Sequence, residues 1–374
     1  MRALIDYRPA LRERSGIGEY THELVRALAA AFPPGRLDLA VFSSSWKDRL
    51  EITEPGFEHV RLIDRRWPVR ALNFAWHRLE TPVVETLVGE TVDVVHSMTP
   101  LLVPSQTAAQ VITIADLSFL TEPAWTRAEV RRDYPALVRA HAARADGVLV
   151  MSEHVGAEVR RTLEIDPDKI AVVPAGAPAW TPRAAPPEHG YILFVGTLEP
   201  RKNVGVLLDA YESALALRGT NPELVIAGKA TEAARGWLER ISRPPLAGNV
   251  KYHGYVSASS RRALYEGASV LVMPSLDEGF GLPVLEAMTL GVPVVASRRG
   301  SLPEVLGDAG QLVDADDAQG FARAIDRVLT DRAFAAACAS KGVARARQFS
   351  WARAAQLTYA LYERAIARKR CASA

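Results

Sequence analysis

Cysteine is scarce in this sequence, and long apolar runs and lysine-rich tracts are missing. Of 374 residues only Cys338 and Cys371 are cysteines. Both lie in segments with a helical pattern, which favours neither a disulfide framework nor a zinc site. No stretch reaches the roughly 20 uninterrupted apolar residues that span a bilayer. The formal net charge is only +2, so the basic surface of a nucleic-acid-binding protein is not expected.

The start of the chain also lacks the features of an export signal. Residues 2–7, RALIDY, read as a strand. They show no basic start, apolar run or small-residue cleavage site. Together with the low cysteine content, this pattern predicts a cytoplasmic protein. The low net charge predicts that nucleic acid is not among its partners.

The sequence does contain enough apolar residues for two domains. A chain of 374 residues exceeds what one hydrophobic core usually supports, which favours two domains of roughly 150 to 200 residues each. Apolar residues make up 48% and charged residues 24%, so parallel sheets covered by helices are expected and disorder is not.

Short apolar strands alternate with helical patterns along the whole chain, which is typical of βαβ units around a parallel sheet. Six predicted strands lie in the first half, at residues 3–6, 38–42, 92–96, 110–114, 147–151 and 170–174. Six more lie in the second half, at residues 191–196, 223–227, 250–253, 269–273, 293–297 and 310–313. The pattern therefore predicts an α/β fold with two similar domains.

The segment between the two series of strands reads as a linker. Residues 174–190 are rich in proline and alanine and show little periodicity. We therefore predict domains at 1–178 and 188–348, followed by a C-terminal helix within 349–374 that packs back on the first domain. Ligands of open parallel sheets bind beyond the carboxyl ends of the strands, so we expect the active site between the two domains.

The most informative segment is residues 275–297, which read SLDEGFGLPVLEAMTLGVPVVAS. Gly279 and Gly281 precede a predicted helix that begins near Pro283. Proline suits the first turn of a helix, and glycines allow backbone amides to approach a ligand closely. The pattern therefore predicts that a polyanion binds at the N-terminus of this helix.

Two glutamates in the same segment indicate a second kind of contact. Glu278 and Glu286 are separated by seven residues, and a carboxylate accepts hydrogen bonds from hydroxyls. Glu278 therefore suits a sugar and Glu286 a ribose. Taken alone, such a pair describes a solvated helix face. The buried strand GVPVVAS and the glycine-led turn GSLPEVL that follow favour the ligand-binding interpretation.

The segment resembles the signature of the retaining GT-B glycosyltransferases of family 4, the group 1 transferases, in which two glutamates seven residues apart lie inside EGFGLPxLEAMxxGxPVVAS. The resemblance extends over nearly the whole chain, through GIGEYTHELVRAL, VDVVHS, TIADLSFL, VMSEH, KIAVVPAGAP, ILFVGTLEPRKN, KYHGYV and LYEGASVLVMPS. It implies a GT-B fold, in which two Rossmann-like domains face a central cleft. It also implies transfer of a hexosyl group from a nucleotide-diphosphate sugar.

The resemblance implies roles for individual residues. Arg201 and Lys202 hold the diphosphate of the donor, Glu278 stands near the transferred sugar, and Glu286 binds the ribose. The other donor-binding positions that it implies are Gly16 and Gly18 in the first loop, Tyr255 and Val256 beside the base, and Gly279, Phe280, Gly281 and Leu282, whose amides face sugar or phosphate.

Each of these roles has a plainer alternative from the residues alone. Arg201 and Lys202 can be exposed side chains of a surface loop. Gly16 can belong to an ordinary turn before a helix, since GIGEYT lacks the third glycine of a dinucleotide-binding fingerprint. Tyr255 can mark an ordinary strand end.

One position departs from the family pattern. TIADLSFL has Ala115 where the family commonly has a histidine near the reacting sugar. Asp116, at the end of a predicted strand, is a candidate catalytic carboxylate, and the alternative is a helix or turn cap. His96 ends the preceding strand and is a further candidate for the cleft, with a structural histidine as the alternative.

The implied mechanism depends on electrostatics more than on a strong base. Arg201, Lys202 and the amides near Gly281 stabilise the departing diphosphate, while the acceptor hydroxyl attacks on the face from which the leaving group departs. Glu278 and Asp116 complete the candidate catalytic set. No DxD-like acidic pair lies beside the donor motif, so we expect neither a metal ion nor a cofactor.

A basic and aromatic segment precedes the middle of the first domain. Residues 61–78 read RLIDRRWPVRALNFAWHR, with five arginines, Trp67, Phe74 and Trp76 against the single acid Asp64. Such a segment can lie on anionic lipid at the inner face of the cell membrane and present a lipid-linked acceptor. The alternative is a helix that uses its aromatic residues for the core.

The donor and the acceptor are less well defined by the sequence. GTLEPRKN resembles the phosphate loop of mannosyltransferases of surface-polysaccharide pathways, so GDP-mannose is the first donor expected, with a glycan or lipid-linked acceptor. Two alternatives remain: a catalytically impaired nucleotide-sugar binding protein, motivated by Ala115, and a nucleotide-sugar epimerase of the same architecture, which the EGFGLP signature disfavours.

Overall fold

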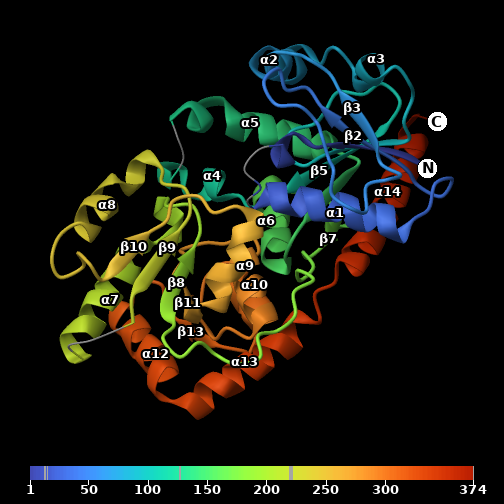
Figure 1. Ribbon diagram of the computed structural model, residues 1–374. Coiled ribbons are helices and arrows are strands. Elements are labelled where there is room, and N and C mark those ends of the chain that lie inside the picture. Colours follow the sequence, from blue (N-terminus) through green and yellow to red (C-terminus); the bar gives the residue numbers. More distant parts are fainter. Residues whose placement is uncertain (12–13, 15, 126–127, 219–221, 374) are drawn as a thin grey trace. The chain divides into compact units, whose positions relative to one another are not determined.

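The computed structural model describes the chain except for residues 12–13, 15, 126–127, 219–221 and 374. The chain forms two compact units (Figure 1). Unit 1 consists of Met1–Gly176 and Ser350–Ala374, and unit 2 consists of Ala177–Phe349. Each unit has one parallel β-sheet with helices, which confirms the predicted α/β fold.

The sheet of unit 1 has seven strands. They are β1 (Arg2–Asp6), β2 (Asp38–Ser43), β3 (Arg61–Asp64), β4 (Val94–Ser97), β5 (Ala109–Ile114), β6 (Gly147–Val150) and β7 (Ile170–Val172). Their order is β3-β2-β1-β4-β5-β6-β7, and all neighbours are parallel. Leu4 pairs with Ala40 on one side and Val95 on the other. The strands therefore end at one common edge, where ligands of such sheets bind.

Helices cover this sheet, and the core lies beneath them. They are α1 (Ile17–Ala31), α2 (Val69–Leu79), α3 (Val84–Val88), α4 (Ser118–Thr121), α5 (Ala128–Arg144), α6 (Glu153–Leu163) and α14 (Trp351–Ser373), with 3-10 turns η1 (Arg8–Ala10), η2 (Pro123–Trp125) and η3 (Pro167–Lys169). One buried cluster joins α2 and α3 to strands β1 to β4. Another joins α5 and α6 to β5 and β6. Each helix thus buries its apolar side on the strands, as the alternating pattern requires.

Strand β3 was not among the predicted strands. It reads RLID, and only Ile63 is buried, while Arg61 and Leu62 are exposed. It is the edge strand of the sheet and pairs only with β2 among the described strands. An edge strand with one buried side chain lacks the apolar run that identifies the inner strands of a parallel sheet, so the pattern did not reveal it.

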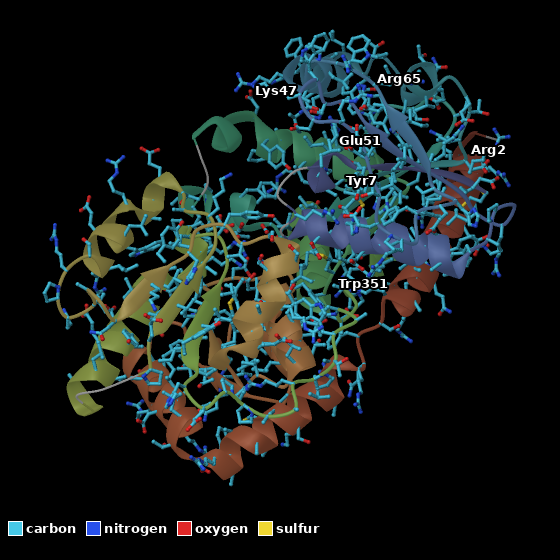
Figure 2. All side chains as sticks on the ribbon, viewed as in Figure 1. Arg2, Tyr7, Lys47, Glu51, Arg65 and Trp351 are labelled. Carbon is cyan, nitrogen blue, oxygen red and sulfur yellow. The ribbon has the colours of Figure 1, made fainter. Side chains whose placement is uncertain are left out.

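Helix α14 belongs to unit 1 although it ends the chain. It contacts α1 and strands β4 to β7, and Figure 1 shows it beside α1. Leu361 and Tyr362 are fully buried. At its start, the ring of Trp351, labelled in Figure 2, lies 5.5 Å from that of Tyr20. A Cβ on Gly176 would lie 2.3 Å from the Trp351 amide nitrogen, so only glycine fits at position 176.

The sheet of unit 2 contains all six predicted strands. They are β8 (Tyr191–Val195), β9 (Leu224–Ala227), β10 (Val250–Tyr252), β11 (Ala268–Met273), β12 (Val294–Ser297) and β13 (Gln311–Val313). Their order is β10-β9-β8-β11-β12-β13, again parallel throughout. The predicted linker contains no helix or strand in residues 174–190, all of which are described.

The helices of unit 2 follow the strands in regular alternation. They are α7 (Val204–Arg218), α8 (Arg235–Ile241), α9 (Ala258–Glu266), α10 (Leu282–Leu290), α11 (Leu302–Leu306), α12 (Ala318–Thr330) and α13 (Arg332–Ala346), with η4 (Pro200–Lys202) and η5 (Glu232–Ala234). Helix α10 packs against α9, α11 and α13. Residues 284–290 of α10 are all buried, so this helix is fixed in the interior of the unit.

Candidate active site

The basic pair of unit 2 lies in a tight turn after β8. Pro200 begins the 3-10 turn η4, which ends at Asn203 in the left-handed conformation, with φ 54°. Asparagine tolerates this conformation, and its Nδ2 donates to the carbonyl oxygens of Pro274 at 3.0 Å and Ala315 at 2.7 Å. The turn is thereby tied to two other segments, so the side chains of Arg201 and Lys202 start from a fixed backbone.

The glutamate segment begins where β11 ends. The chain runs from Met273 to Gly281, whose φ of 101° is left-handed and favours glycine. Helix α10 then begins at Leu282, with Pro283 in its first turn, which confirms the predicted helix start. The backbone amide of Leu276 donates to the carbonyl of Arg201 at 2.8 Å. The loops after β8 and β11 are therefore joined directly.

The joined loops form a buried cluster of charged groups. The Lys202 ammonium donates to Oε1 of Glu278 at 2.5 Å. Arg201 Nη1 lies 3.3 Å from Oε2 of the same carboxylate and donates to the Asp277 carbonyl at 2.9 Å. Ser275 Oγ donates to Glu278 Oε1 at 2.7 Å. Lys202 and Glu278 are only 8% and 5% exposed, so these charges are held away from bulk water.

The backbone around Glu278 is supported from the opposite side by the loop after β12. Ser301 donates to the Glu278 carbonyl from its amide at 3.0 Å and from Oγ at 2.9 Å. The preceding Gly300 has φ 59°, and a Cβ there would lie 2.5 Å from the Glu278 amide nitrogen. Only glycine allows the two backbones to approach this closely. The position of Glu278 is therefore fixed by both of its neighbouring loops.

The cluster keeps Glu278 ionised. Burial by itself would raise the pKa of this carboxyl group, but Lys202 and then Arg201 outweigh it, and the pKa lies below its ordinary value. Burial lowers the pKa of Lys202, and the attraction of Glu278 opposes that effect. Arg201 Nη2 also forms an ion pair with Glu199 at 2.9 Å, so two carboxylates balance the two cations. Arg201 and Lys202 are the groups of the cluster that suit an anionic ligand.

The second glutamate of the motif lies on α10 and contacts α9. Glu286 Oε2 accepts from the Tyr265 hydroxyl at 2.7 Å, and Oε1 forms an ion pair with Arg261 Nη2 at 2.9 Å. Glu286 is 7% exposed and Tyr265 is fully buried. The carboxylate is therefore held on both oxygens by side chains of one neighbouring helix.

The predicted base-binding pair follows β10. Tyr255 is an exposed side chain, and Val256 is half-buried. Gly254, just before them, has φ 65°, and its carbonyl accepts from the amide of Gly228 at 2.7 Å. The loops after β9 and β10 thus meet through their backbones, and the ring of Tyr255 remains accessible.

Three predicted site residues lie in unit 1. Gly16 is exposed before α1, with φ 51°. Gly18 is buried, and a Cβ there would lie 2.5 Å from the carbonyl oxygen of Pro9, so glycine is required for η1 and α1 to pack. Asp116 follows β5, and its Oδ1 accepts from the amide of Ser118 at 3.1 Å and from its hydroxyl at 2.7 Å. Asp116 thus forms the capping contacts that were the alternative to a catalytic role.

His96 is a structural histidine. It is fully buried, with Nδ1 2.8 Å from the Tyr362 hydroxyl and Nε2 2.8 Å from Thr113 Oγ1. Burial lowers the pKa of His96 to about 3. Both ring nitrogens have partners in the interior of unit 1, so the suggestion that it lines a ligand cleft is wrong.

Unit 1 has a cavity of about 810 Å³ at the carboxyl ends of β1, β2 and β3. Arg8 and Pro9 line it from the end of β1. The loop after β2 contributes Trp46 and Lys47, and the first turn of α2 contributes Arg70. The volume lies in the range of small-molecule sites, and the position agrees with the ligand edge of an open parallel sheet.

Two family models match the chain. The model described as "Glycosyl transferases group 1" matches residues 189–331, and that described as "Glycosyl transferase 4-like domain" matches residues 15–176. O-antigen chain mannosyltransferase B of Escherichia coli is 30% identical over 376 residues, covering 94% of this chain and 96% of that protein.

The chain is a group 1 glycosyltransferase.

Other relatives and solved structures agree with this assignment. The MMP alpha-(1->4)-mannosyltransferase of Mycolicibacterium hassiacum is 30% identical and covers 65% of this chain and 61% of that protein. Sucrose-phosphate synthase from Thermosynechococcus elongatus matches with a TM-score of 0.76 at 23% identity, covering 97% of this chain and 98% of that one. WaaG, a glycosyltransferase involved in lipopolysaccharide biosynthesis, matches with a TM-score of 0.73 at 17% identity, covering 96% and 98%. The fold is therefore GT-B.

Four side chains that hold the two glutamates of this candidate site were not predicted from the sequence. Ser275 and Ser301 hold Glu278, and Tyr265 and Arg261 hold Glu286. Ser301 lies in a turn that the glycine-led pattern GSLPEVL had already marked. No comparable signal marked Tyr265, because a buried tyrosine in a helix looks like any other core residue until its hydroxyl partner is known.

Two features are absent from the described residues: a membrane-spanning helix and a cluster of metal-ligating side chains. In the part of the chain that the structure describes, no helix has both the length and the apolar composition of a membrane-spanning segment. Within the same part of the chain, no group of three or more His, Cys, Asp or Glu side chains is arranged to hold a metal ion.

Proposed function

We propose that this glycosyltransferase moves a mannosyl group from GDP-mannose to a glycan or lipid-linked acceptor, with retention of the anomeric configuration. The observation that carries the proposal is the buried cluster of Lys202, Arg201 and Glu278 in unit 2. The choice of mannose is supported by the names of the two mannosyltransferases that resemble this chain.

Lys202 and Arg201 bind the diphosphate of the donor in this proposal. An ammonium has three N–H donors, and Glu278 accepts one of them from Lys202. Arg201 offers a fork of donors that suits phosphate oxygens. Both side chains are oriented in advance by the carboxylate, so little reorganisation is needed when the leaving group develops charge.

The start of α10 supplies backbone donors and a favourable dipole. The first amides of a helix lack partners within it and carry partial positive charge. The amides of Val284 and Leu285 donate to Gly281. We assign the preceding amides of Phe280, Gly281 and Leu282 to the sugar or its phosphate, with Gly279 beside the donor. Glu286 accepts from the ribose, and Tyr255 and Val256 flank the base.

Glu278 is unsuited to act as a nucleophile. Its Oε1 accepts from both Lys202 and Ser275, and its Oε2 faces Arg201. A carboxylate that is ion-paired with both Lys202 and Arg201 is a weak nucleophile, because attack on carbon would remove its negative charge from beside both cations. This supports same-face attack by the acceptor hydroxyl, with a phosphate oxygen accepting the proton and with neither metal nor cofactor required.

Unit 1 binds the acceptor in this proposal. The cavity of about 810 Å³ beside Trp46 and Lys47 offers an aromatic surface and a cation at the ligand edge of the sheet. Gly16 and Gly18 shape the first turn of α1. Asp116 is the proposed carboxylate on the acceptor side, in addition to its contacts with Ser118.

The test is a binding and hydrolysis screen of the purified chain against GDP-mannose, UDP-glucose and UDP-GlcNAc. We expect selective turnover of GDP-mannose that is lost in Glu278→Ala and Lys202→Ala. Lys341→Ala is the matched control, because Lys341 forms an exposed ion pair with Asp308 in the same unit. Proton NMR of the transferred sugar reports the anomeric configuration, and an inverted product would contradict retention.

The same screen separates the alternatives. Tight donor binding without turnover, with candidate acceptors present, would favour a catalytically impaired binding protein, which Ala115 makes conceivable. Conversion of the donor sugar into its epimer without an acceptor would favour an epimerase. Turnover of UDP-glucose in place of GDP-mannose would contradict the proposed donor and still support the proposed transferase activity.

We further propose that unit 1 rests on the cytoplasmic face of an anionic membrane. Helix α2 buries Leu72 and Trp76 and leaves Phe74 and Leu79 exposed at 63% and 62%. Trp67, in the segment before α2, is also exposed, as are the arginines at 65, 66 and 70 in the same stretch of the chain. Figure 2 labels Arg65 and Lys47, which lie near α3 and α2 respectively. Exposed aromatic and basic groups together fit a lipid interface.

Vesicle sedimentation tests this contact. We expect binding to phosphatidylcholine vesicles that contain phosphatidylglycerol, weaker binding as salt rises, and little binding to phosphatidylcholine alone. Replacing Arg65, Arg66 and Arg70 together by Gln should abolish it. A control variant replaces Arg235, Arg243 and Arg332, which are exposed in unit 2. Binding that is absent or insensitive to salt would contradict the proposal.

A further inference from the structure

Helix α9 holds the second glutamate of the motif through two of its residues. The Tyr265 hydroxyl donates to Glu286 Oε2 at 2.7 Å, and Arg261 Nη2 lies 2.9 Å from Oε1. Donors from α9 on both oxygens fix the plane of the carboxylate group. A carboxylate oxygen can accept more than one hydrogen bond, so the contacts with α9 do not by themselves exclude contacts to ligand hydroxyls.

Burial makes these contacts important for the Glu286 carboxylate. Its side chain is 10% exposed, and that of Arg261 is 11% exposed. A carboxylate removed from water needs an opposite charge and hydrogen bonds to remain ionised. Arg261 supplies the charge and Tyr265 supplies a donor from the core. Burial, followed by the charge of Glu286, raises the pKa of Tyr265 well above its ordinary value, so its hydroxyl stays protonated and able to donate.

We propose that Tyr265 and Arg261 are positioning residues that hold Glu286 in the orientation in which it accepts hydrogen bonds from the ribose hydroxyls of the donor. The inference rests on the proposed function, which places the ribose at Glu286. A carboxylate fixed before the ligand arrives loses less conformational entropy on binding. The geometry therefore makes the contribution of the ribose hydroxyls to affinity depend on residues that do not touch the nucleotide.

The experiment measures how much the ribose hydroxyls contribute to affinity. Isothermal titration calorimetry compares GDP with 2′,3′-dideoxy-GDP, and UDP with 2′,3′-dideoxy-UDP, in the wild type and in Tyr265→Phe. We expect Tyr265→Phe to weaken the binding of the nucleotide that carries ribose hydroxyls about tenfold, which is the size of effect expected for a lost hydrogen bond to a charged group. The dideoxy nucleotide should bind the variant and the wild type equally.

Two matched controls separate positioning from simple support of the fold. Tyr211→Phe removes another buried hydroxyl of unit 2, which donates to the carbonyls of Pro222 and Asn249. It should cost similar stability and leave the ribose contribution unchanged. Arg261→Gln should reduce that contribution. Arg262→Gln, at an exposed residue paired with Glu266, should not.

The outcomes distinguish this inference from the proposed function. Equal weakening of hydroxylated and dideoxy nucleotides in Tyr265→Phe, or no weakening at all, would overturn the positioning role and leave the donor site intact. Failure of the wild type to bind any of the four nucleotides would contradict the proposed function, and the inference with it. Loss of the ribose contribution in Tyr265→Phe with none in Tyr211→Phe would support the inference.

Discussion

The two units bury different sets of ionisable groups. Unit 1 buries His22, His96 and His141 together with one carboxylate, Asp6, which forms an ion pair with Arg8 at the end of β1, whereas unit 2 buries Lys202 and two glutamates. The histidines of unit 1 have lowered pKa values and therefore remain neutral. The buried groups of unit 2 form ion pairs. Neutral histidines with hydrogen-bond partners are compatible with a stable core, whereas buried charges are costly and mark a candidate site.

This difference separates what stabilises each fold from what binds the ligand. In unit 1, His96 joins β4 to α14 and β5 through two neutral hydrogen bonds. In unit 2, Lys202 and Glu278 join two loops at the carboxyl ends of strands, where a ligand is expected. Changing one kind of group at a time separates these two contributions.

The largest effect is expected from removing one charge of the buried pair. Lys202→Met should lower the free energy of unfolding by about 3–5 kcal/mol, because Glu278 loses its nearest cation in the interior. Donor turnover should fall at least about 100-fold, as for the loss of a donor to the leaving group. Urea unfolding and a donor-turnover assay measure the two effects.

A second variant tests whether the lost stability comes from the uncompensated charge. Lys202→Met combined with Glu278→Gln should recover part of the stability and none of the turnover. Lys341→Met, in an exposed ion pair, should change stability by less than about 1 kcal/mol. A double variant as unstable as Lys202→Met would show that packing, and not charge, explains the loss.

Acid should destabilise unit 1 through its histidines. Burial, and after it the guanidinium of Arg14, lowers the pKa of His22 to about 4, against about 6.5 in an unfolded chain. The unfolded state therefore binds the proton more tightly. The contribution of neutral His22 is complete above pH 6.5 and is lost as pH falls to about 4. The loss is on the order of 3 kcal/mol.

Hydrogen exchange with mass spectrometry localises this effect. Corrected for the intrinsic exchange rate, protection in β1 and α1 should fall between pH 6.5 and 4.5. Protection in β8 and β11 should hold better, since Glu278 has a lowered pKa and stays ionised there. His22→Gln should flatten the pH dependence of unit 1, and His253→Gln, at an exposed residue of unit 2, should not. Equal losses in both units would contradict the comparison.

A glycine pair tests how closely the loop after β12 must approach Glu278. Gly300→Ala should destabilise unit 2 by about 2 kcal/mol or more, since a Cβ there would lie 2.5 Å from the Glu278 amide nitrogen in a left-handed backbone. Gly248→Ala has a similar backbone strain, with φ 82°, and no atom within 4 Å, so it should cost about 1 kcal/mol. Calorimetry compares them, and equal costs would show that the close approach is unimportant.

The smallest change in stability is expected at Asp116. In Asp116→Asn the amide oxygen can still accept from Ser118, so the free energy of unfolding should change by less than about 0.5 kcal/mol. Transfer to the acceptor should nevertheless fall at least about tenfold, because the negative charge is lost. Unchanged transfer would leave Asp116 as a cap only.

Much of the fold was predictable because its signals are local. Buried parallel strands read as apolar runs, so all six strands of unit 2 and six of the seven in unit 1 were identified. Strand β3 was missed because it lies at the edge and buries only Ile63. The start of α10 followed from the Gly and Pro that precede and open it. Segment boundaries of this kind depend on a few residues that are neighbours in the sequence.

The candidate site was predictable only in part. Glu278, Arg201 and Lys202 were predicted as site residues from the family resemblance, whereas their mutual contact depends on packing between two loops that are 76 and 77 residues apart in sequence. Ser301, Arg261 and Tyr265 were missed because their hydrogen-bond partners are distant in sequence. The structural role of His96 likewise depends on Tyr362, 266 residues away.

The central claim is that the buried cations of unit 2 hold the diphosphate of the donor. The most direct measurement is calorimetric binding of guanosine, GMP and GDP to the wild type and to Lys202→Met. We predict that wild-type affinity rises strongly from guanosine to GDP, and that Lys202→Met removes most of this gain while binding guanosine normally. A Lys202→Met variant that folds and binds GDP as tightly as the wild type would contradict the claim.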